Sequence, residues 1–282
     1  IQAYFKNCFI DGNTDYIFGG GDVLFDACEL SYYGYSNTQK GAYITAAADG
    51  STTGYIFRNC YVSANDAWDV ASGYFGRPWR SSATVAFLNT KLQTKDTVTA
   101  VGWNSMSGAR PEDANYQEYN TTVLGSGAAD VSARTAGTVK NENPYADIVQ
   151  TFKGWQPFYF VQETDTAVTV KDIAIEGELK TGSVLKALYT LSGNEKADAS
   201  VLEWYRITPS GEETLVKAVP SYADKSYTIT QEDAGCSIKL VIKPETISGT
   251  TGDSKSFVSA QVPKQPTKPE QPSKPEQPDV PS

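Results

Sequence analysis

The fold of the first half of the chain is decided by a six-residue template that occurs four times: FKNCFI (5–10), FDACEL (25–30), FRNCYV (57–62) and FLNTKL (87–92). The fourth positions of successive segments lie 20, 32 and 30 residues apart. Glycine and asparagine occupy the intervening turns, and no amphipathic helix between the segments is long enough for a βαβ crossover. A short strand that recurs at this spacing predicts a right-handed parallel β-helix in which each repeat is one coil.

In such a solenoid, equivalent positions of successive coils stack in register. The residues Cys8, Cys28 and Cys60, followed by Thr90, are therefore expected to form an inward ladder of small side chains. The wide cysteine spacing contains no CxxC pair and fits neither a disulfide framework nor a zinc site. We therefore expect no metal and no other cofactor.

Composition excludes several classes of function. The 282 residues carry 24 Lys and Arg against 33 Asp and Glu, a net charge of −9, which argues against a nucleic-acid-binding protein. The absence of histidine excludes Ser-His-Asp and Cys-His catalysis and histidine-ligated zinc. No run of about eighteen apolar residues is present, so no insertion into a membrane is expected.

Changes in composition divide the chain into three parts. Residues 1–163, rich in Gly, Asn, Tyr and Phe, form the predicted β-helix. Residues 164–262 contain seven short β-branched segments and predict a β-sandwich, in which Trp204 and the segment EDAGCSIKLVI (232–242) resemble bacterial immunoglobulin-like domains. Residues 263–282, PKQPTKPEQPSKPEQPDVPS, predict a disordered, Pro-rich spacer. The predicted class is all-β.

Asp15 is the most unusual carboxylate of the first part. It follows a turn-like stretch, DGNT (11–14), and precedes the strand-like YIF (16–18). An acid between aromatic and β-branched neighbours is either a solvated turn residue or a placed catalytic carboxylate. Composition alone leaves both interpretations open.

Arg77 and Trp79 belong to the segment YFGRPWR (74–80). Pro78 fixes its own φ and favours an extended conformation at Arg77, so Arg77 and Trp79 should project to the same side. A guanidinium can hold a carboxylate in a fork, and an indole offers a flat face to a pyranose ring. The alternative is a structural cation–π pair on the surface.

Three blocks together resemble the pectin methylesterase (pectinesterase) family: GNTDYIFGG (12–20), FGRPWR (75–80) and VGWNSMSG (101–108). The resemblance covers about residues 1–160, implies the right-handed parallel β-helix of that family, and is supported by a Glu118-Tyr119-Asn120 element. It implies hydrolysis of the C6 methyl esters of galacturonate to carboxylate and methanol.

The resemblance also implies roles for single residues. The family's nucleophilic aspartate falls on Asp15, its nucleophile-binding arginine on Arg77, and its substrate-contacting tryptophan on Trp79. Phe18 and Met106 match positions that line the family's substrate groove. The implied partner is methyl-esterified homogalacturonan.

The resemblance also indicates what these 282 residues do not contain. The family's second aspartate, which is the general acid/base, lies in a Gln-Asp-Thr-Leu block upstream of DYIFG, as do the glutamines that stabilise the oxyanion. We therefore expect the sequence to be the C-terminal part of the catalytic β-helix and to be inactive alone. The polymeric substrate and the spacer predict a secreted protein, held at a bacterial surface by an anchor beyond Ser282.

Two other functions remain open at this stage. A non-catalytic pectin- or glycan-binding β-helix would use Arg77 and Trp79 for binding, with Asp15 only structural. A pectate or polygalacturonate depolymerase of this architecture, if a lyase, would need a calcium-binding acidic cluster. The sequence offers none, because Asp22 and Asp26 are interpreted as turn and outward strand residues.

Overall fold

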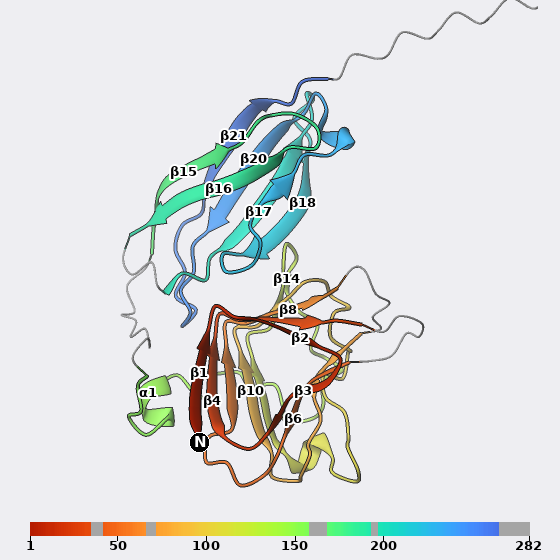
Figure 1. Ribbon diagram of the computed structural model, residues 1–282, viewed down its shortest axis with the longest axis vertical. Coiled ribbons are helices and arrows are strands. Elements are labelled where there is room, and N and C mark those ends of the chain that lie inside the picture. Colours follow the sequence, from red (N-terminus) through yellow and green to blue (C-terminus); the bar gives the residue numbers. More distant parts are fainter. Residues whose placement is uncertain (35–41, 66–71, 158–167, 193–196, 265–282) are drawn as a thin grey trace, which may run out of the picture.

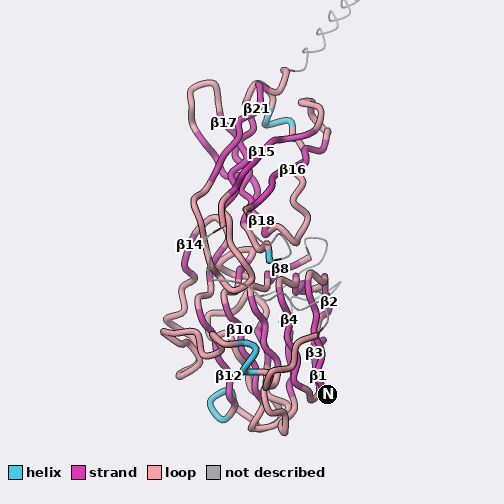
Figure 2. Tube along the Cα trace, turned by 90° about the vertical axis from the view of Figure 1, so that its left-hand side faces the viewer, coloured by secondary structure: helices cyan, strands magenta, loops and turns pink. Residues whose placement is uncertain are grey.

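The computed structural model describes residues 1–34, 42–65, 72–157, 168–192 and 197–264. An immunoglobulin-like domain stands on one corner of a β-helix (Figures 1 and 2). The predicted boundary at 163/164 and, from residue 265 on, the predicted spacer lie outside the described residues. In the parts of the chain that are described, every helix is too short or too polar to span a lipid bilayer.

The β-helix is built from three sheets, here called sheets A, B and C. Sheet A has the order β1-β4-β7-β10-β12: Gln2–Lys6, Asp22–Asp26, Tyr55–Arg58, Thr84–Leu88 and Asn115–Tyr119. Sheet B has the order β14-β13-β11-β8-β5-β2: Gly127–Ala128, Thr122–Val123, Lys91–Leu92, Tyr61–Ala64, Glu29–Tyr32 and Phe9–Gly12. Sheet C has the order β3-β6-β9: Thr14–Gly19, Tyr43–Ala47 and Tyr74–Gly76. In Figure 1, β1, β2 and β3 form three sides of the first coil.

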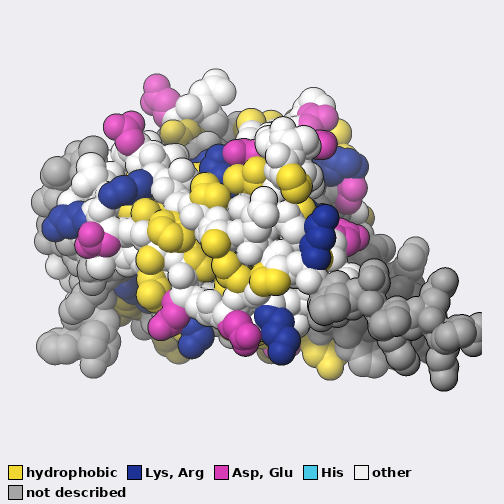
Figure 3. Space-filling model, turned by 90° about the horizontal axis from the view of Figure 1, so that it is seen from above, with side chains coloured by type: hydrophobic (Ala, Val, Ile, Leu, Met, Phe, Trp, Pro, Cys, Tyr) yellow, Lys and Arg dark blue, Asp and Glu magenta, His cyan; other side chains and the backbone are white. Residues whose placement is uncertain are grey.

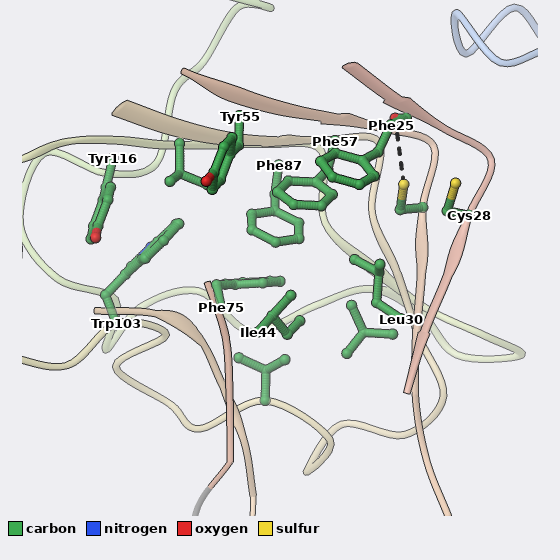
Figure 4. Close-up of a cluster of buried hydrophobic side chains, with 14 of the residues drawn as sticks. Phe25, Cys28, Leu30, Ile44, Tyr55, Phe57, Phe75, Phe87, Trp103 and Tyr116 are labelled. Carbon is green, nitrogen blue, oxygen red and sulfur yellow. Dashed lines mark hydrogen bonds between the residues drawn. The ribbon is translucent and has the colours of Figure 1, made fainter. Parts of the chain in front are cut away.

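Parallel pairing in register stacks the phenylalanines of the repeated template. Phe25 pairs with Phe57, and Phe57 with Phe87, along sheet A. Each pair of rings is stacked with centroids 4.4 Å apart, and the rings lie one above another inside the solenoid (Figure 4). The pattern arises because a parallel strand presents the same side chain to the core in every coil. The prediction that the first part is an all-β, parallel solenoid is thus confirmed.

The template is not a single strand, as the sequence suggested, but a strand, a corner and a second strand. The corner residue has a left-handed backbone in four successive coils, at Asn7, Ala27, Asn59 and Asn89, with φ between 48° and 53°. Asparagine tolerates this conformation better than most residues. The residue that follows each corner belongs to the expected inward ladder of small side chains. Of these residues, Cys28, Cys60 and Thr90 are fully buried, and Cys8 is half-buried.

Asp26 is an outward-facing strand residue, as the sequence predicted, and its side chain is fully buried. Arg58 of the next coil binds both of its oxygens, with N–O distances of 2.8 and 2.7 Å, and the hydroxyl of Tyr4 donates to one of them. Asp26 is therefore a structural ion-pair partner.

Two short helices lie beside the β-helix. The outer face of sheet A is covered by α1 (Ile148–Thr151), whose Ile148 packs with Phe152 on Leu24, Ile56 and Leu88. A 3-10 turn at Pro111–Asp113 precedes β12.

The second domain is the antiparallel sandwich that the sequence predicted. Its three-stranded sheet is β15-β16-β19, and its four-stranded sheet is β18-β17-β20-β21. The strands span Val170–Glu176, Val184–Leu191, Val201–Ile207, Glu213–Pro220, Tyr227–Thr228, Ser237–Lys243 and Lys255–Gln261, with a 3-10 turn at Gln231–Asp233. Trp204 is fully buried in its core and stacks on Tyr227, with ring centroids 5.7 Å apart.

The second domain contacts the β-helix at the corner between sheets A and B, where the asparagine side chains project outward. The side chain of Asn59 donates to Glu245 (2.7 Å) and to the carbonyl of Thr246 (3.0 Å), and Asn89 donates to the carbonyl of Ser248 (3.2 Å). Nζ of Lys91 lies 3.1 Å from Glu245, and both side chains are largely buried. Burial lowers the pKa of Lys91, an effect that Glu245 opposes. The two domains are therefore held together by directional contacts between buried polar groups.

Replacing Phe57 by alanine is expected to lower the free energy of unfolding by about 3–5 kcal/mol, because it opens a cavity in the ring stack. Phe9→Ala is the matched control: this ring is 63% exposed, so a change of at most about 0.5 kcal/mol is expected. Urea unfolding followed by circular dichroism measures both. Equal losses in the two variants would contradict the stacked core.

Replacing Glu245 by glutamine is expected to lower stability by about 3–5 kcal/mol, because Lys91 is left charged and buried at the domain interface. The control is Asp96→Asn, which breaks the exposed pair Lys95–Asp96 and is expected to cost at most about 1 kcal/mol. Scanning calorimetry of the whole chain compares the two variants. A Glu245→Gln protein as stable as Asp96→Asn would show that the interface does not depend on this pair.

Candidate active site

Asp15 lies on β3, at an irregular point of sheet C. Thr14 pairs with Tyr43 and Ile17 with Thr45, so the register shifts by one residue between them. Asp15 itself has φ of 51°, a left-handed conformation that is uncommon for residues other than glycine, although asparagine and aspartate adopt it more often than most. A bulge of this kind redirects a side chain out of the regular alternation, and strained backbone of this kind concentrates at functional sites. The Asp15 side chain is 17% exposed.

Arg77 directly follows β9, the third strand of the same sheet, and its side chain reaches Asp15. The Nε atom of Arg77 lies 2.9 Å from one carboxylate oxygen of Asp15, and its Nη2 atom lies 2.7 Å from the other. The two residues therefore form a bidentate (two-pronged) ion pair. The Arg77 side chain is 23% exposed, so the pair is partly accessible to solvent. Because β6 separates β3 from β9, the contact spans two coils and passes over the middle strand.

The backbone around Arg77 continues the pairing of β9 with β6. The amides of Arg77 and Trp79 donate to the carbonyls of Thr45 and Ala47, at 3.0 and 3.1 Å. Pro78, which has no amide hydrogen, falls on the position between them, where none is needed. Gly76 is required just before this segment, because a Cβ there would collide with the hydroxyl of Thr45. These contacts direct Arg77 and Trp79 to the same side of the sheet.

Tyr43 supports Arg77 from the middle strand. The guanidinium carbon of Arg77 lies 4.1 Å from the centroid of the Tyr43 ring, a cation–π contact. Tyr43 in turn stacks on Tyr74, with centroids 5.0 Å apart and planes at 11°. The amide of Asn104 donates to the Tyr43 hydroxyl at 3.0 Å. The guanidinium is therefore held at its edge by Asp15 and at its face by Tyr43.

Phe18 and Trp79 form an exposed aromatic pair beside the ion pair. Phe18 is 67% exposed and Trp79 38% exposed, and their rings meet edge to face with centroids 6.2 Å apart. Arg80 lies over the Trp79 ring at 5.5 Å. Flat apolar side chains that stay in solvent next to a charged pair suit the apolar face of a sugar ring.

Met106 lies farther along the segment that carries Asn104. It is half-buried on a tight turn, where its backbone pairs with Ala109 in both directions, at 3.0 and 2.9 Å. Its assignment to the substrate groove stays a prediction.

Glu118, from the element that supported the resemblance, is a buried framework residue. It accepts hydrogen bonds from Trp103 (3.0 Å) and Arg134 (3.1 Å). Burial raises the pKa of Glu118, and the charge of Arg134 opposes that rise. The network anchors Trp103, and thereby the strand-like segment that leads to Asn104.

The residues that the sequence did not single out are Tyr43, Tyr74 and Asn104. Tyr43 begins the segment YITAA (43–47), which carries no charge or motif that marks it. The alignment of its coil with the coil of DYIFG could have placed Tyr43 beside Thr14. In the described parts of the chain, no group of three or more Cys, Asp or Glu residues could hold a metal ion.

Comparison with known proteins gives the following matches. Residues 1–147 match the family model Pectinesterase, and residues 169–259 match the model AIR9 A9 domain. "Probable pectinesterase A" of Neosartorya fischeri is 38% identical over 138 residues, which are 47% of this chain and 38% of that protein. "Pectinesterase A" of Emericella nidulans is 35% identical over 136 residues, 46% of this chain and 38% of that protein.

Among solved structures, "The structure of rice weevil pectin methyl esterase" is similar with a TM-score of 0.36 and 18% identity, over 43% of this chain and 41% of that one. The chain thus spans well under half the length of the relatives it matches. The family model nevertheless covers more than half of this chain, residues 1–147 of 282. The chain therefore belongs to the pectinesterase family and carries an immunoglobulin-like domain after its β-helix.

Proposed function

We propose that this chain carries the nucleophile side of a pectin methylesterase, which hydrolyses the C6 methyl esters of galacturonate in homogalacturonan. The observation that carries the proposal is the two-pronged Asp15–Arg77 pair, partly accessible to solvent beside Phe18 and Trp79. A buried structural pair such as Asp26–Arg58 is closed to substrate, whereas this pair lies within reach of a polymer.

The proposed reaction has two steps. An oxygen of Asp15 attacks the ester carbonyl, and the tetrahedral intermediate expels methanol after a proton reaches the leaving oxygen. Water then hydrolyses the resulting anhydride and regenerates Asp15, leaving the C6 carboxylate on the sugar. Arg77 orients the attacking carboxylate and supplies the countercharge, while Trp79 and Phe18 hold the sugar ring.

A second carboxylic acid and oxyanion donors are needed to complete this chemistry. The sequence contains no Gln-Asp-Thr-Leu block that would supply them. One oxyanion donor is worth about 3 kcal/mol, and general acid–base catalysis contributes about a hundredfold or more. We infer that these 282 residues by themselves release methanol at no more than a trace rate.

The chemistry also implies a location. Homogalacturonan is a cell-wall polymer too large to enter a cell, so its esterase acts outside. We propose that the protein is secreted, and that the Pro-rich segment 263–282 spaces it from a bacterial surface to which a further segment attaches it.

Replacing Asp15 by asparagine is expected to lower methanol release from methyl-esterified pectin at least about a thousandfold, because the amide cannot form the acyl intermediate. The measurement uses a polypeptide in which this chain is joined to the acid/base block. Asp11→Asn, an exposed carboxylate four residues earlier, should keep the parent rate. Normal release by Asp15→Asn would favour the glycan-binding alternative, and a fall in polymer length would favour a depolymerase.

Tyr43→Leu is expected to lower kcat about tenfold or more with little change in KM, because Arg77 loses the ring that holds its face. Tyr43→Phe keeps the ring and loses only the hydrogen bond from Asn104, so it should retain most of the rate. Initial rates of methanol release over a range of pectin concentrations separate the two parameters. A rise in KM alone would mean that Tyr43 contacts the sugar and does not position Arg77.

A further inference from the structure

The immunoglobulin-like domain contains a pocket that the proposed reaction does not use. It has a volume of about 410 Å³ and lies between β16 and the loop that leads to β19. Lys186, Leu188 and Tyr189 of β16 form one wall, and Asp224, Lys225 and Ser226 of the loop form the other. This volume is within the range of small-molecule sites.

The loop wall of the pocket is fixed in place. The carbonyl of Lys225 accepts a hydrogen bond from the buried Trp204 indole (3.3 Å), and the carbonyl of Ser226 accepts one from Lys217 (2.7 Å). The carboxylate of Asp224 accepts from the amide and hydroxyl of Ser226, at 3.1 and 2.8 Å. A pocket with rigid walls loses little conformational entropy when a ligand binds.

The lining combines an apolar surface with cationic groups. Leu188 is 47% exposed, and the Tyr189 ring lies 5.3 Å from Nζ of Lys225. The Tyr189 hydroxyl donates to Asp198 at 2.5 Å, which fixes the orientation of the ring. An apolar wall contacts the C–H face of a pyranose, and ammonium groups bind a sugar carboxylate.

The local charge favours an anion although the whole chain is acidic. Lys186 and Lys225 are both exposed. Within the described part of the chain, neither ammonium group lies within 4.0 Å of a carboxylate oxygen. The one carboxylate of the lining, Asp224, is already engaged by Ser226 and lies 3.6 Å from Lys217. Two further acids lie nearby: Glu176, opposite Lys186 on β15, and Asp198, which accepts the hydrogen bond from Tyr189. Seen from the end formed by this domain, both acidic and basic side chains lie around a band of hydrophobic ones (Figure 3).

We propose that this pocket binds a galacturonate residue of demethylated pectin, the acidic product of the esterase. The inference rests on the proposed function, which supplies a polymer whose carboxylates appear as the reaction proceeds. The same loop begins at Tyr222, whose hydroxyl donates to the carbonyl of Asn59 in the β-helix. This contact ties the pocket loop to the β-helix, and two linked sites that engage one polymer at the same time bind it more tightly than either site alone.

The test measures binding by the whole 282-residue chain, without turnover, using calorimetry at low ionic strength with three polymers. Polygalacturonate is the expected ligand, highly methyl-esterified pectin tests the need for carboxylates, and poly-glutamate tests the need for a sugar. The variant is the double substitution Lys186→Ala and Lys225→Ala. Its control, Lys171→Ala with Lys180→Ala, removes two exposed lysines of the same domain outside the pocket lining.

The pocket variant is expected to bind polygalacturonate about tenfold more weakly than the parent, with unchanged binding of methyl-esterified pectin and an unchanged melting temperature. The control variant should bind like the parent. The proposal is overturned if the parent does not bind polygalacturonate, if the pocket variant binds it normally, or if poly-glutamate binds equally and loses affinity equally. Methanol release and its dependence on Asp15 are separate readouts, so the failure of one proposal is distinguishable from the failure of the other.

Discussion

The in-register stacking of parallel coils is the constraint on which the rest of the structure depends. Phe25, Phe57 and Phe87 stack because their strands pair without a shift along sheet A. The same regular spacing fixes what each coil presents on its outer surface. Asp15 and Arg77 are 62 residues apart in sequence, yet they meet because their coils lie two steps apart along one axis.

At the candidate site, the strand pairing and the backbone conformation differ locally from those of the regular coils. Asp15 lies at a register shift with a left-handed backbone, and the segment after Gly76 extends sheet C through a proline. Each departure is supported by neighbours: Tyr43 supports the guanidinium, and Thr45 and Ala47 accept the amides that flank Pro78. A regularly packed solenoid can hold such strained positions, which suits the proposed role of Asp15 as a carboxylate that attacks with a defined geometry.

Much of the architecture could be predicted because short sequence patterns that recur along the chain determine it. The FKNC-type template predicts the coils, and alternating β-branched segments predict the sandwich. The corner at Asn59 and the burial of Asp26 could not be predicted, since a strand and a strand–corner–strand share one pattern and burial depends on Arg58 of the next coil. The two-pronged contact of Arg77 with Asp15 follows the expectation from the motifs, whereas the place of Tyr43 depends on which coil lies between them.

In the proposed complex, a methyl ester of the polymer lies against Asp15 with its sugar ring on Trp79. A crystal structure of this chain with a methyl-esterified galacturonate oligosaccharide tests this placement. We expect the C6 carbonyl carbon about 3–3.5 Å from a carboxylate oxygen of Asp15, with the ring against the indole. An oligosaccharide bound on another face, or one whose C6 ester points away from Asp15, would rule this placement out.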